Sequence, residues 1–125
     1  MNKKILAIEG SPRKGSNSDL LCDAFLKGAA ERGNFTEKIY VQDLKLQPCL
    51  ACYGCRDTQK CVQKDNIHNV IEKMIEADVI LLATPVYFYS LSGQMKVFID
   101  RCLPKYEKIS KKDFYFVATA ADENA

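Results

Sequence analysis

Residues 4–18, with the sequence KILAIEGSPRKGSNS, are the stretch that decides the fold. The first six are mostly apolar and predict a short strand, which Gly10, Ser11 and Pro12 end. After Ser18 the apolar residues are spaced to lie on one face of a helix, at Leu20, Leu21, Ala24, Phe25 and Gly28. The stretch therefore predicts a strand, a tight polar loop and a helix.

The strand and helix signals go on alternating beyond this stretch. Gly33 is placed to end the helix, and residues 37–44, EKIYVQDL, alternate in the manner of a second strand. Asp65 is placed to cap a second helix, whose apolar stripe consists of Ile67, Val70, Ile71, Met74 and Ile75. Residues 78–84, DVILLAT, are almost wholly apolar, which indicates a central parallel strand covered on both faces.

The last third of the chain repeats the pattern. Ser92 is placed to cap a third helix, and residues 111–120 contain a fourth strand, DFYFVATA. Four strands separated by three helices predict an α/β fold with a doubly wound parallel sheet. Ligands of such sheets bind outside the carboxyl ends of the strands, so the informative loops are residues 10–18, 85–90 and 120–124.

Length and composition set the class of protein. A chain of 125 residues with 47% hydrophobic content is one domain, which we expect to span residues 1–125. Lys and Arg number 18 against 16 Asp and Glu, and the basic residues are scattered, so nothing favours a nucleic acid or an anionic membrane as partner. Because no apolar stretch approaches a membrane span or an export signal, we expect a cytoplasmic protein with a small-molecule partner.

The first loop has the chemistry of a phosphate site. It combines glycines with hydroxyl, amide and cationic side chains just before a helix N-terminus, at Ser11, Arg13, Lys14, Ser16, Asn17 and Ser18. It is neither a Walker loop nor the GxGxxG loop of dinucleotide-binding sheets, so a monophosphate fits better than ATP or a nicotinamide dinucleotide. The alternative from composition is an ordinary polar strand-to-helix loop with a serine cap.

Three segments together resemble a known family. They are GSPRKGSNSDLL at residues 10–21, TPVYFYSLSGQMKVFIDR at residues 84–101 and TAAD at residues 119–122. They are similar to the NAD(P)H-dependent FMN reductase and iron–sulfur flavoprotein branch of the flavodoxin-like families, over nearly the whole chain. The resemblance implies an FMN-dependent oxidoreductase or electron-transfer flavoprotein on a flavodoxin-like sheet, with NAD(P)H as a candidate reductant.

The same resemblance implies positions for the cofactor. The FMN phosphate would lie against Ser11, Arg13, Ser16, Asn17 and Ser18. The isoalloxazine ring would lie over Pro85, Val86, Tyr87 and Phe88, with Thr119, Ala121 and Asp122 closing its other side. The residues themselves support the ring position, because aromatic side chains beside a proline at the end of a buried strand offer stacking surface. The alternative is that these aromatic residues belong to the core or to an interface.

A cysteine-rich loop at residues 47–64 forms a second group of candidate functional residues. Its spacing is CxxCxxC followed by five residues and a fourth cysteine, at Cys49, Cys52, Cys55 and Cys61. Thiolates spaced in this way can hold a [4Fe-4S] cluster, and the motif resembles the compact cysteine motif of iron–sulfur flavoproteins. A zinc site and a loop of free thiols stay open as alternatives. The other two cysteines, Cys22 and Cys102, fall on apolar helix faces and are expected to be buried.

No side chain is assigned a catalytic role, because bound FMN itself accepts a hydride or single electrons. Electrons would come from NAD(P)H or, through the cluster, from a ferredoxin-like donor. Asp100 and Arg101, at the end of the third helix, are expected in surface or subunit contacts. The alternatives to a flavin enzyme are another phosphate-binding α/β enzyme and a redox-sensing or zinc- and thiol-dependent interaction module without turnover.

The predicted sheet is one strand short of the family pattern. Flavodoxin-like sheets have five parallel strands in the order 2-1-3-4-5, whereas four are predicted here, with the fifth strand and the last helix missing. The fourth strand would then be an exposed apolar edge, which another subunit, an exchanged segment or a part of the protein absent from this chain would cover. We therefore expect a homo-oligomer, either a dimer or a tetramer.

Overall fold

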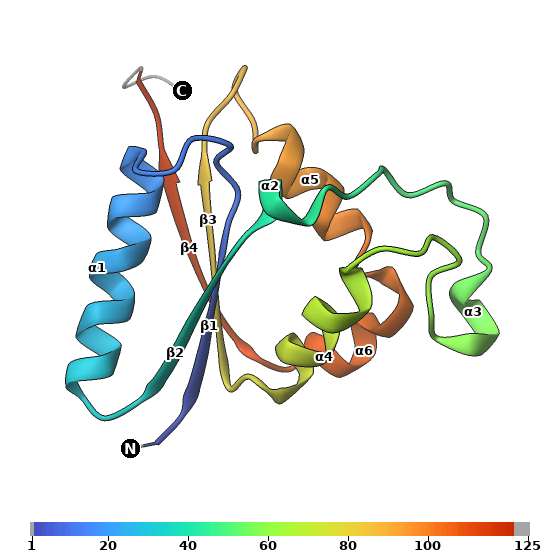
Figure 1. The fold of residues 1–125 in the computed structure, drawn as a ribbon, viewed down its shortest axis with the longest axis horizontal. Coiled ribbons are helices and arrows are strands. Elements are labelled where there is room, and N and C mark those ends of the chain that lie inside the picture. The colour runs from blue at the N-terminus through green and yellow to red at the C-terminus, as the bar shows by residue number, and fades with distance from the viewer. Residues whose placement is uncertain (1, 122–125) are drawn as a thin grey trace.

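A four-stranded parallel sheet forms the centre of the computed structural model, which describes residues 2–121 (Figure 1). Its order is β2-β1-β3-β4, with β1 at Lys4–Glu9, β2 at Phe35–Tyr40, β3 at Val79–Pro85 and β4 at Asp113–Thr119. All three pairings are parallel, and Ile5 of β1 lies opposite Thr36 of β2 and Val79 of β3. The predicted doubly wound parallel sheet is confirmed, and these four strands have the flavodoxin-like order.

Helices cover both faces of this sheet. α1 (Asn17–Glu31) lies on one face, and α4 (Ile67–Glu76), α5 (Gly93–Asp100) and α6 (Tyr106–Ile109) lie on the other (Figure 1). The shorter elements are α2 (Val41–Leu44), α3 (Cys55–Thr58) and a 3-10 turn at Leu103–Lys105. Within residues 2–121, no helix is long and apolar enough to span a membrane.

The side of the sheet under α4 and α5 holds the larger apolar core. Ile8 and Ile80 of the sheet pack there against the predicted apolar stripe of α4, which is buried at Ile67, Val70, Ile71 and Met74. Burying each such side chain contributes about 1.5–3 kcal/mol. The Asp65 carboxylate accepts a hydrogen bond from the Ile67 N–H (3.1 Å), so Asp65 stabilises the start of α4 as predicted, although Asn66 occupies the cap position.

The buried face of α1 differs from the predicted one. Leu20 and Leu21 are 58% and 49% exposed, and the helix packs on the sheet through Cys22 and Phe25 instead. The reason is that Ser18, at the start of the helix, is fully buried in polar contacts. A helix that buries position 18 also buries positions 22 and 25 rather than 20 and 21.

The second strand begins and ends earlier than predicted. It spans Phe35–Tyr40 rather than residues 37–44, and Val41–Leu44 forms the short helix α2. Gly33 follows α1 with a left-handed φ of 84°, as its placement predicts, and the chain enters the sheet two residues later. The Phe35 N–H then donates to the Lys3 carbonyl (2.9 Å), which fixes the start of the pairing with β1.

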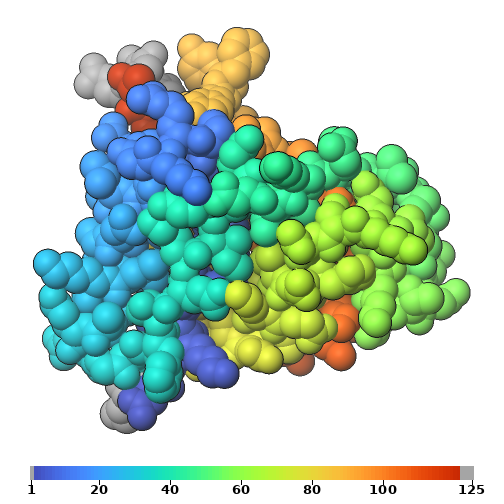
Figure 2. Space-filling view, in the orientation of Figure 1, coloured from blue at the N-terminus to red at the C-terminus, as the bar shows by residue number. Residues whose placement is uncertain are grey.

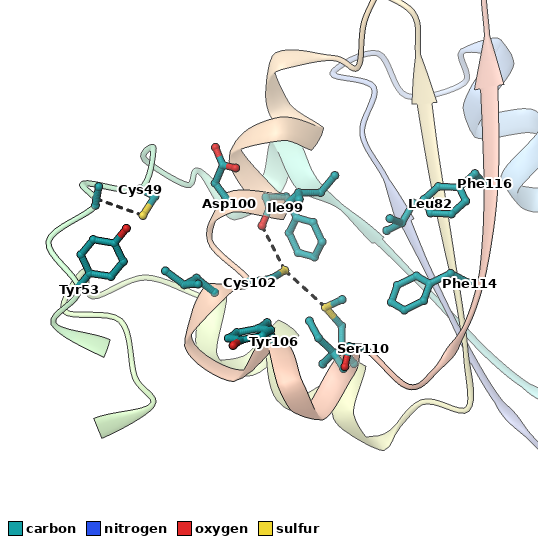
Figure 3. A pocket seen from close by; sticks show the side chains of 15 residues that line it. Cys49, Tyr53, Leu82, Ile99, Asp100, Cys102, Tyr106, Ser110, Phe114 and Phe116 are labelled. Carbon is teal, nitrogen blue, oxygen red and sulfur yellow. Dashed lines mark hydrogen bonds between the residues drawn. The ribbon is translucent and has the colours of Figure 1, made fainter. Parts of the chain in front are cut away.

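β4 forms one edge of the sheet. Tyr115 and Phe116 are 53% and 73% exposed there, as predicted for an apolar edge. A cavity of about 790 Å³ opens beside the strand, between Phe114 and Phe116 on one side and Ile99 and Tyr106 on the other (Figure 3). This edge therefore presents apolar surface that favours a covering partner.

Candidate functional site

Three segments meet at the carboxyl edge of the sheet, where the sequence predicts the ligand. They are the loop after β1, the loop after β3 and the end of β4, at the top of Figure 1. The Gly10 N–H donates to the Ala83 carbonyl (2.8 Å), and the Val86 N–H donates to the Thr119 carbonyl (2.7 Å). The Ser92 hydroxyl, which caps α5 as predicted, donates to the Gly10 carbonyl (2.7 Å). The predicted loops therefore belong to one connected surface.

A buried carboxylate lies on the inner side of the loop after β1. Glu9 is fully buried, and its Oε1 accepts hydrogen bonds from the Ser11 N–H (2.8 Å) and the Ser18 hydroxyl (2.9 Å). Its Oε2 is also buried and has no hydrogen-bond partner among residues 2–121. Burial raises the pKa of Glu9 above its ordinary value, although both hydrogen bonds act in the opposite direction. Glu9 thus holds the two ends of the loop together.

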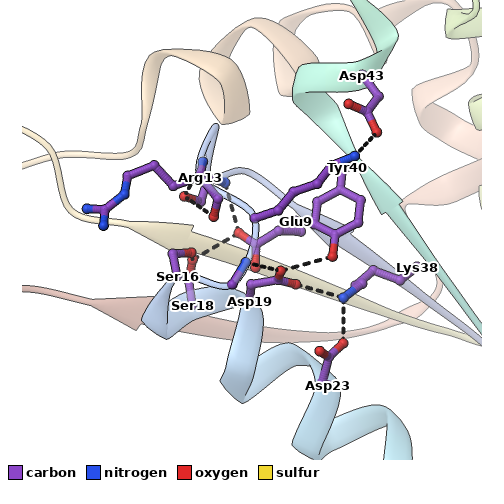
Figure 4. A network of polar contacts seen from close by, with 12 residues as sticks. Glu9, Arg13, Ser16, Ser18, Asp19, Asp23, Lys38, Tyr40 and Asp43 are labelled. Atoms are coloured by element: carbon purple, nitrogen blue, oxygen red, sulfur yellow. Dashed lines mark hydrogen bonds and ion pairs between the residues drawn. The ribbon is translucent and has the colours of Figure 1, made fainter.

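A second acidic residue holds the same loop from α1 (Figure 4). The Asp19 carboxylate accepts hydrogen bonds from the Gly15 N–H (2.8 Å), the Lys38 ammonium (2.7 Å) and the Tyr40 hydroxyl (2.9 Å). Burial acts to raise the pKa of Asp19, but these hydrogen bonds outweigh it and hold the pKa below its ordinary value. Gly15 has a φ of 82°, so the turn that presents its N–H to Asp19 requires glycine.

Sequence reasoning missed these supporting residues. The available signal for Glu9 was a single charged residue at the end of an otherwise apolar strand. Asp19 could have been found as an acidic residue in the first turn of the helix that follows the loop. Both are buried charges, and such groups are retained where they are paired or hydrogen-bonded.

The residues predicted to bind the phosphate fall into two groups. The Ser11 and Ser18 side chains are buried, and their hydroxyl groups are hydrogen-bonded within the protein. Arg13 and Asn17 are exposed, and Ser16 is half-buried with its Oγ 3.3 Å from the Ser18 Oγ. The N–H groups in the first turn of α1 have no partners within the helix. The loop therefore offers an anion the side chains of Arg13, Ser16 and Asn17 together with a helix N-terminus.

The loop after β3 is a tight turn of aromatic residues. Tyr87 and Ser90 exchange backbone hydrogen bonds (3.0 and 3.1 Å), and Phe88 and Tyr89 between them have left-handed φ values of 47° and 66°. Residues other than glycine rarely adopt this conformation, and such strain concentrates at functional sites. Phe88 is 95% exposed, and the turn projects from the molecule next to the loop after β1 (Figure 2). The alternative that these rings belong to the core is therefore wrong.

The other residues predicted around the ring lie beside this turn. Pro85 and Val86 are half-buried at the end of β3, Thr119 pairs with Pro85 in the register of β4, and Ala121 is exposed just beyond. Asp122 lies outside the described residues. None of the described residues predicted to bind FMN lines the 790 Å³ cavity beside β4. The predicted ring site is an open surface between loops rather than that cavity.

The cysteine-rich loop lies beyond α4 and α5, away from the sheet (Figure 1). All six cysteines of the chain are free thiols, and the four in the loop, Cys49, Cys52, Cys55 and Cys61, line one small cavity. Within residues 2–121, however, no three Cys, His, Asp or Glu side chains lie close enough together to hold a metal ion. The loop thus brings the four predicted ligands to one place without completing a metal site.

Arg101 is the buried cation at this cavity. It is 1% exposed, so the predicted surface or subunit contact is wrong for Arg101, whereas its neighbour Asp100 is exposed. Its guanidinium donates to both carboxylate oxygens of Asp65 (3.0 Å each), the Gln47 carbonyl (2.8 Å) and the Cys61 Sγ (3.3 Å). The Arg101 Nε is buried and has no partner among residues 2–121.

Residues 3–125 match the family model described as NADPH-dependent FMN reductase. The chain belongs to this family. An iron-sulfur flavoprotein of Methanocaldococcus jannaschii is 42% identical over 101 residues, which are 81% of this chain and 52% of that protein. An iron-sulfur flavoprotein of Methanosarcina thermophila is 42% identical over 98 residues, 78% of this chain and 51% of that protein.

A solved structure agrees with the sequence comparisons. An NADH:FMN oxidoreductase in its apo form superposes with a TM-score of 0.75 at 25% identity, covering 98% of this chain and 61% of that chain. The predicted resemblance to FMN reductases and iron–sulfur flavoproteins is thereby confirmed. The chain spans about half the length of the curated relatives described above.

The donor groups of this FMN reductase family member fit two kinds of cofactor. The exposed Arg13 and Asn17 beside a helix N-terminus fit a phosphate monoester, which accepts several charge-assisted hydrogen bonds. Four thiols around one cavity, which the buried Arg101 also lines, have the donor chemistry of an anionic thiolate-bound metal centre, although no three of them lie close enough together to hold a metal ion within residues 2–121. The first site lies at the carboxyl edge of the sheet, and the second lies past the end of α5.

Proposed function

We propose that this protein binds FMN at the carboxyl edge of its sheet and works as an NAD(P)H-dependent oxidoreductase or electron-transfer flavoprotein. Family membership supports the cofactor and the class of reaction. The observation that carries the proposal is the junction of three loops at that edge, the first of which is rich in anion-binding groups. In an open α/β sheet this edge is where ligands bind.

The FMN phosphate is assigned to the loop at residues 10–18. Arg13 and Asn17 are exposed there, and α1 presents its N-terminal N–H groups. Glu9 and Asp19 accept hydrogen bonds from backbone N–H groups of the loop, so its shape is set before a phosphate binds. Donors arranged in advance reduce the entropy lost on binding.

The isoalloxazine ring is assigned to the surface formed by Pro85, Val86 and the aromatic turn that follows them. FMN bound there would supply the redox chemistry, because its ring accepts a hydride or single electrons. The residues of the chain orient the ring: Tyr87 and Phe88 offer exposed apolar area, and the Val86 N–H bond to Thr119 fixes the two sides of the site. No protein side chain needs to act as an acid, base or nucleophile.

The finer proposal is that the cysteine-rich loop holds a [4Fe-4S] cluster. The spacing CxxCxxC within one loop is typical of cluster ligands, and two relatives carry the name iron-sulfur flavoprotein. Metal binding itself completes such sites, because a loop orders when its thiolates are drawn to the metal. A cluster here suits a ferredoxin-like electron donor, whereas NAD(P)H can reduce FMN directly without a cluster.

We also propose a homo-oligomer, a dimer or a tetramer, in the cytoplasm. β4 presents an edge with exposed Tyr115 and Phe116, and a second copy of the chain that covered it would remove both from water. The six free thiols suit a reducing compartment.

The visible spectrum of the anaerobically purified protein tests the proposal. We expect resolved flavin bands that bleach when NADH or NADPH is added, and a broad shoulder accompanied by about four iron and four acid-labile sulfide per chain. Flavin bands without iron would support the flavoprotein proposal and refute the cluster proposal. A colourless protein that binds zinc would favour the second candidate function, a thiol-dependent interaction module. The exposure of Cys49 and Cys52 supports that candidate, because a partner could reach both thiols.

A further inference from the structure

We propose that Arg101 is a positioning residue: it holds the cysteine-rich loop on the body of the protein, and its hydrogen bond to Cys61 raises the reduction potential of a cluster in that loop. The part that concerns the cluster rests on the proposed function. The part that concerns the loop stands on contacts within the chain.

Arg101 joins both ends of the loop to the end of α5. The carbonyl of Gln47, the first loop residue, accepts from Nη1 (2.8 Å), and Asp65, the residue after the last, accepts from both terminal nitrogens (3.0 Å each). Asp65 also accepts from the Ile67 N–H, so the same contact reaches α4. One planar guanidinium therefore fixes where the loop leaves the protein and where it returns.

The ion pair of Arg101 is strongly held. Arg101 is 1% exposed and the Asp65 side chain 18%, and removing one partner of a buried pair is strongly destabilising because it leaves the other charge uncompensated. Burial acts to lower the pKa of Arg101, but Asp65 and Cys61 outweigh it and raise the pKa above its ordinary value. The guanidinium therefore keeps its charge at any physiological pH.

Cys61 differs from the other loop cysteines in its contact with this cation. Its Sγ lies 3.3 Å from the Arg101 Nη2 and also accepts from the Gln63 N–H (3.4 Å). The Cys49 sulfur, in contrast, accepts from a neutral backbone N–H, that of Ala51 (3.4 Å). Charge-assisted hydrogen bonds are about twice as strong as neutral ones. The Cys61 sulfur therefore accepts a charge-assisted hydrogen bond from the protein, whereas the Cys49 sulfur accepts a neutral one.

A cation at a ligand sulfur favours the reduced form of a cluster. Reduction adds one electron and no atom, so the cluster becomes more negative and its sulfurs become stronger hydrogen-bond acceptors. Hydrogen bonds to the sulfurs and the local charge are among the factors that set cluster potentials. In the titration described next the electron comes from dithionite, which is oxidised to sulfite.

The test compares Arg101→Gln with the matched control Arg56→Gln. Arg56 is an exposed residue of the same loop that stacks on Tyr53, so its substitution removes the same charge without touching Cys61. In an anaerobic dithionite titration, we expect Arg101→Gln to shift the reduction equilibrium about tenfold against the reduced cluster, or about 59 mV for one electron. Arg101→Lys should recover part of the shift, and Arg56→Gln should stay within about twofold of the wild type. Equal potentials in all four proteins would overturn the tuning role.

A second measurement keeps the positioning role separate from the cluster. In the protein without added iron, Arg101→Gln should speed proteolysis within residues 47–64 about tenfold, and Arg56→Gln should not. An unchanged cleavage rate would overturn the positioning role. If Arg101→Gln does not fold, Arg101→Met with Asp65→Asn replaces it, because the Asn oxygen can still accept from the Ile67 N–H. A wild type that never takes up iron would sink the cluster proposal and the tuning role, and the proteolysis result would still decide the positioning role.

Discussion

The hydroxyl of Ser18 lies 2.9 Å from the Oε1 of Glu9, a buried carboxylate directly behind the loop assigned to the FMN phosphate. The contact ties the start of α1 to the end of β1 and so shapes the loop. An ionised Glu9 also repels a phosphate bound on the other side of that loop. One residue therefore both organises the proposed site and opposes its ligand.

Glu9→Gln separates these two effects. A glutamine oxygen can still accept from the Ser11 N–H and the Ser18 hydroxyl, while the negative charge is lost. We expect FMN affinity at neutral pH to rise about fivefold, which corresponds to about 1 kcal/mol of partly screened repulsion. Fluorescence titration with FMN measures it. The control is Glu31→Gln, the same change of charge at the opposite end of α1, and a loss of affinity in Glu9→Gln alone would refute the prediction.

Asp19→Asn should lower the free energy of unfolding by about 1–3 kcal/mol at neutral pH, because the Asp19 carboxylate has three hydrogen-bond donors. The native pKa of Asp19 is below its ordinary value, so its stabilisation is complete above the ordinary pKa and is lost as pH falls through the native pKa. The difference in free energy of unfolding between the wild type and Asp19→Asn should therefore disappear at acidic pH. Urea unfolding at several pH values measures it.

The matched control for that experiment is Asp23→Asn. Asp23 pairs with the same Lys38 ammonium, but its side chain is 55% exposed. Exposed ion pairs contribute about 1 kcal/mol at most. Equal losses in the two variants would show that the buried network around Asp19 has no special role.

Substitution of Phe88 by glycine in the strained aromatic turn should change stability and FMN binding in opposite directions. Phe88→Gly should raise the free energy of unfolding of the FMN-free protein by roughly 0.5–1 kcal/mol, because glycine adopts the left-handed φ of 47° without strain and the lost ring is 95% exposed. Phe88→Ala removes the same ring and keeps the strain, so it should give no such gain. Both variants should weaken FMN binding to a similar extent, and tight binding by either would remove Phe88 from the ring site.

The buried and the exposed cysteines should differ in how fast their thiols react. Burial raises the pKa of Cys22 to about 12 and that of Cys102 to about 12, so neither forms much thiolate at pH 8. Cys49 and Cys52 are exposed. We expect iodoacetamide to label these two at least a hundredfold faster than Cys22 and Cys102 in the native iron-free protein, measured by peptide mass spectrometry. In denaturant all six should react alike.

The parts of the fold that the sequence predicted best are those set by apolar pattern. β3 is an almost wholly apolar run, and the α4 stripe repeats at helical spacing, so both were found close to their observed bounds. The face of α1 was predicted wrongly because buried Ser18 and Asp19 set its rotation. Such polar contacts depend on partners elsewhere in the chain and leave no periodic signal.

The candidate sites also divide into those that local sequence predicts and those that depend on contacts between distant residues. The loop at residues 10–18 and the aromatic turn were identified from local composition, because their chemistry lies in consecutive residues. Arg101 was not, since its partners Asp65 and Cys61 are 36 and 40 residues away in the chain. Only the packing of α5 against the cysteine-rich loop brings them together.

Comparing FMN with riboflavin tests the central claim most directly, because the two ligands share the ring and differ only in the phosphate. Charge-assisted hydrogen bonds from the loop should make FMN bind at least about a hundredfold more tightly than riboflavin, or about 2.7 kcal/mol. Arg13→Gln should reduce that ratio about tenfold while leaving riboflavin binding unchanged. Equal affinity for the two ligands, or no binding of FMN, would contradict the assignment of the loop at residues 10–18 to the phosphate and with it the proposed function.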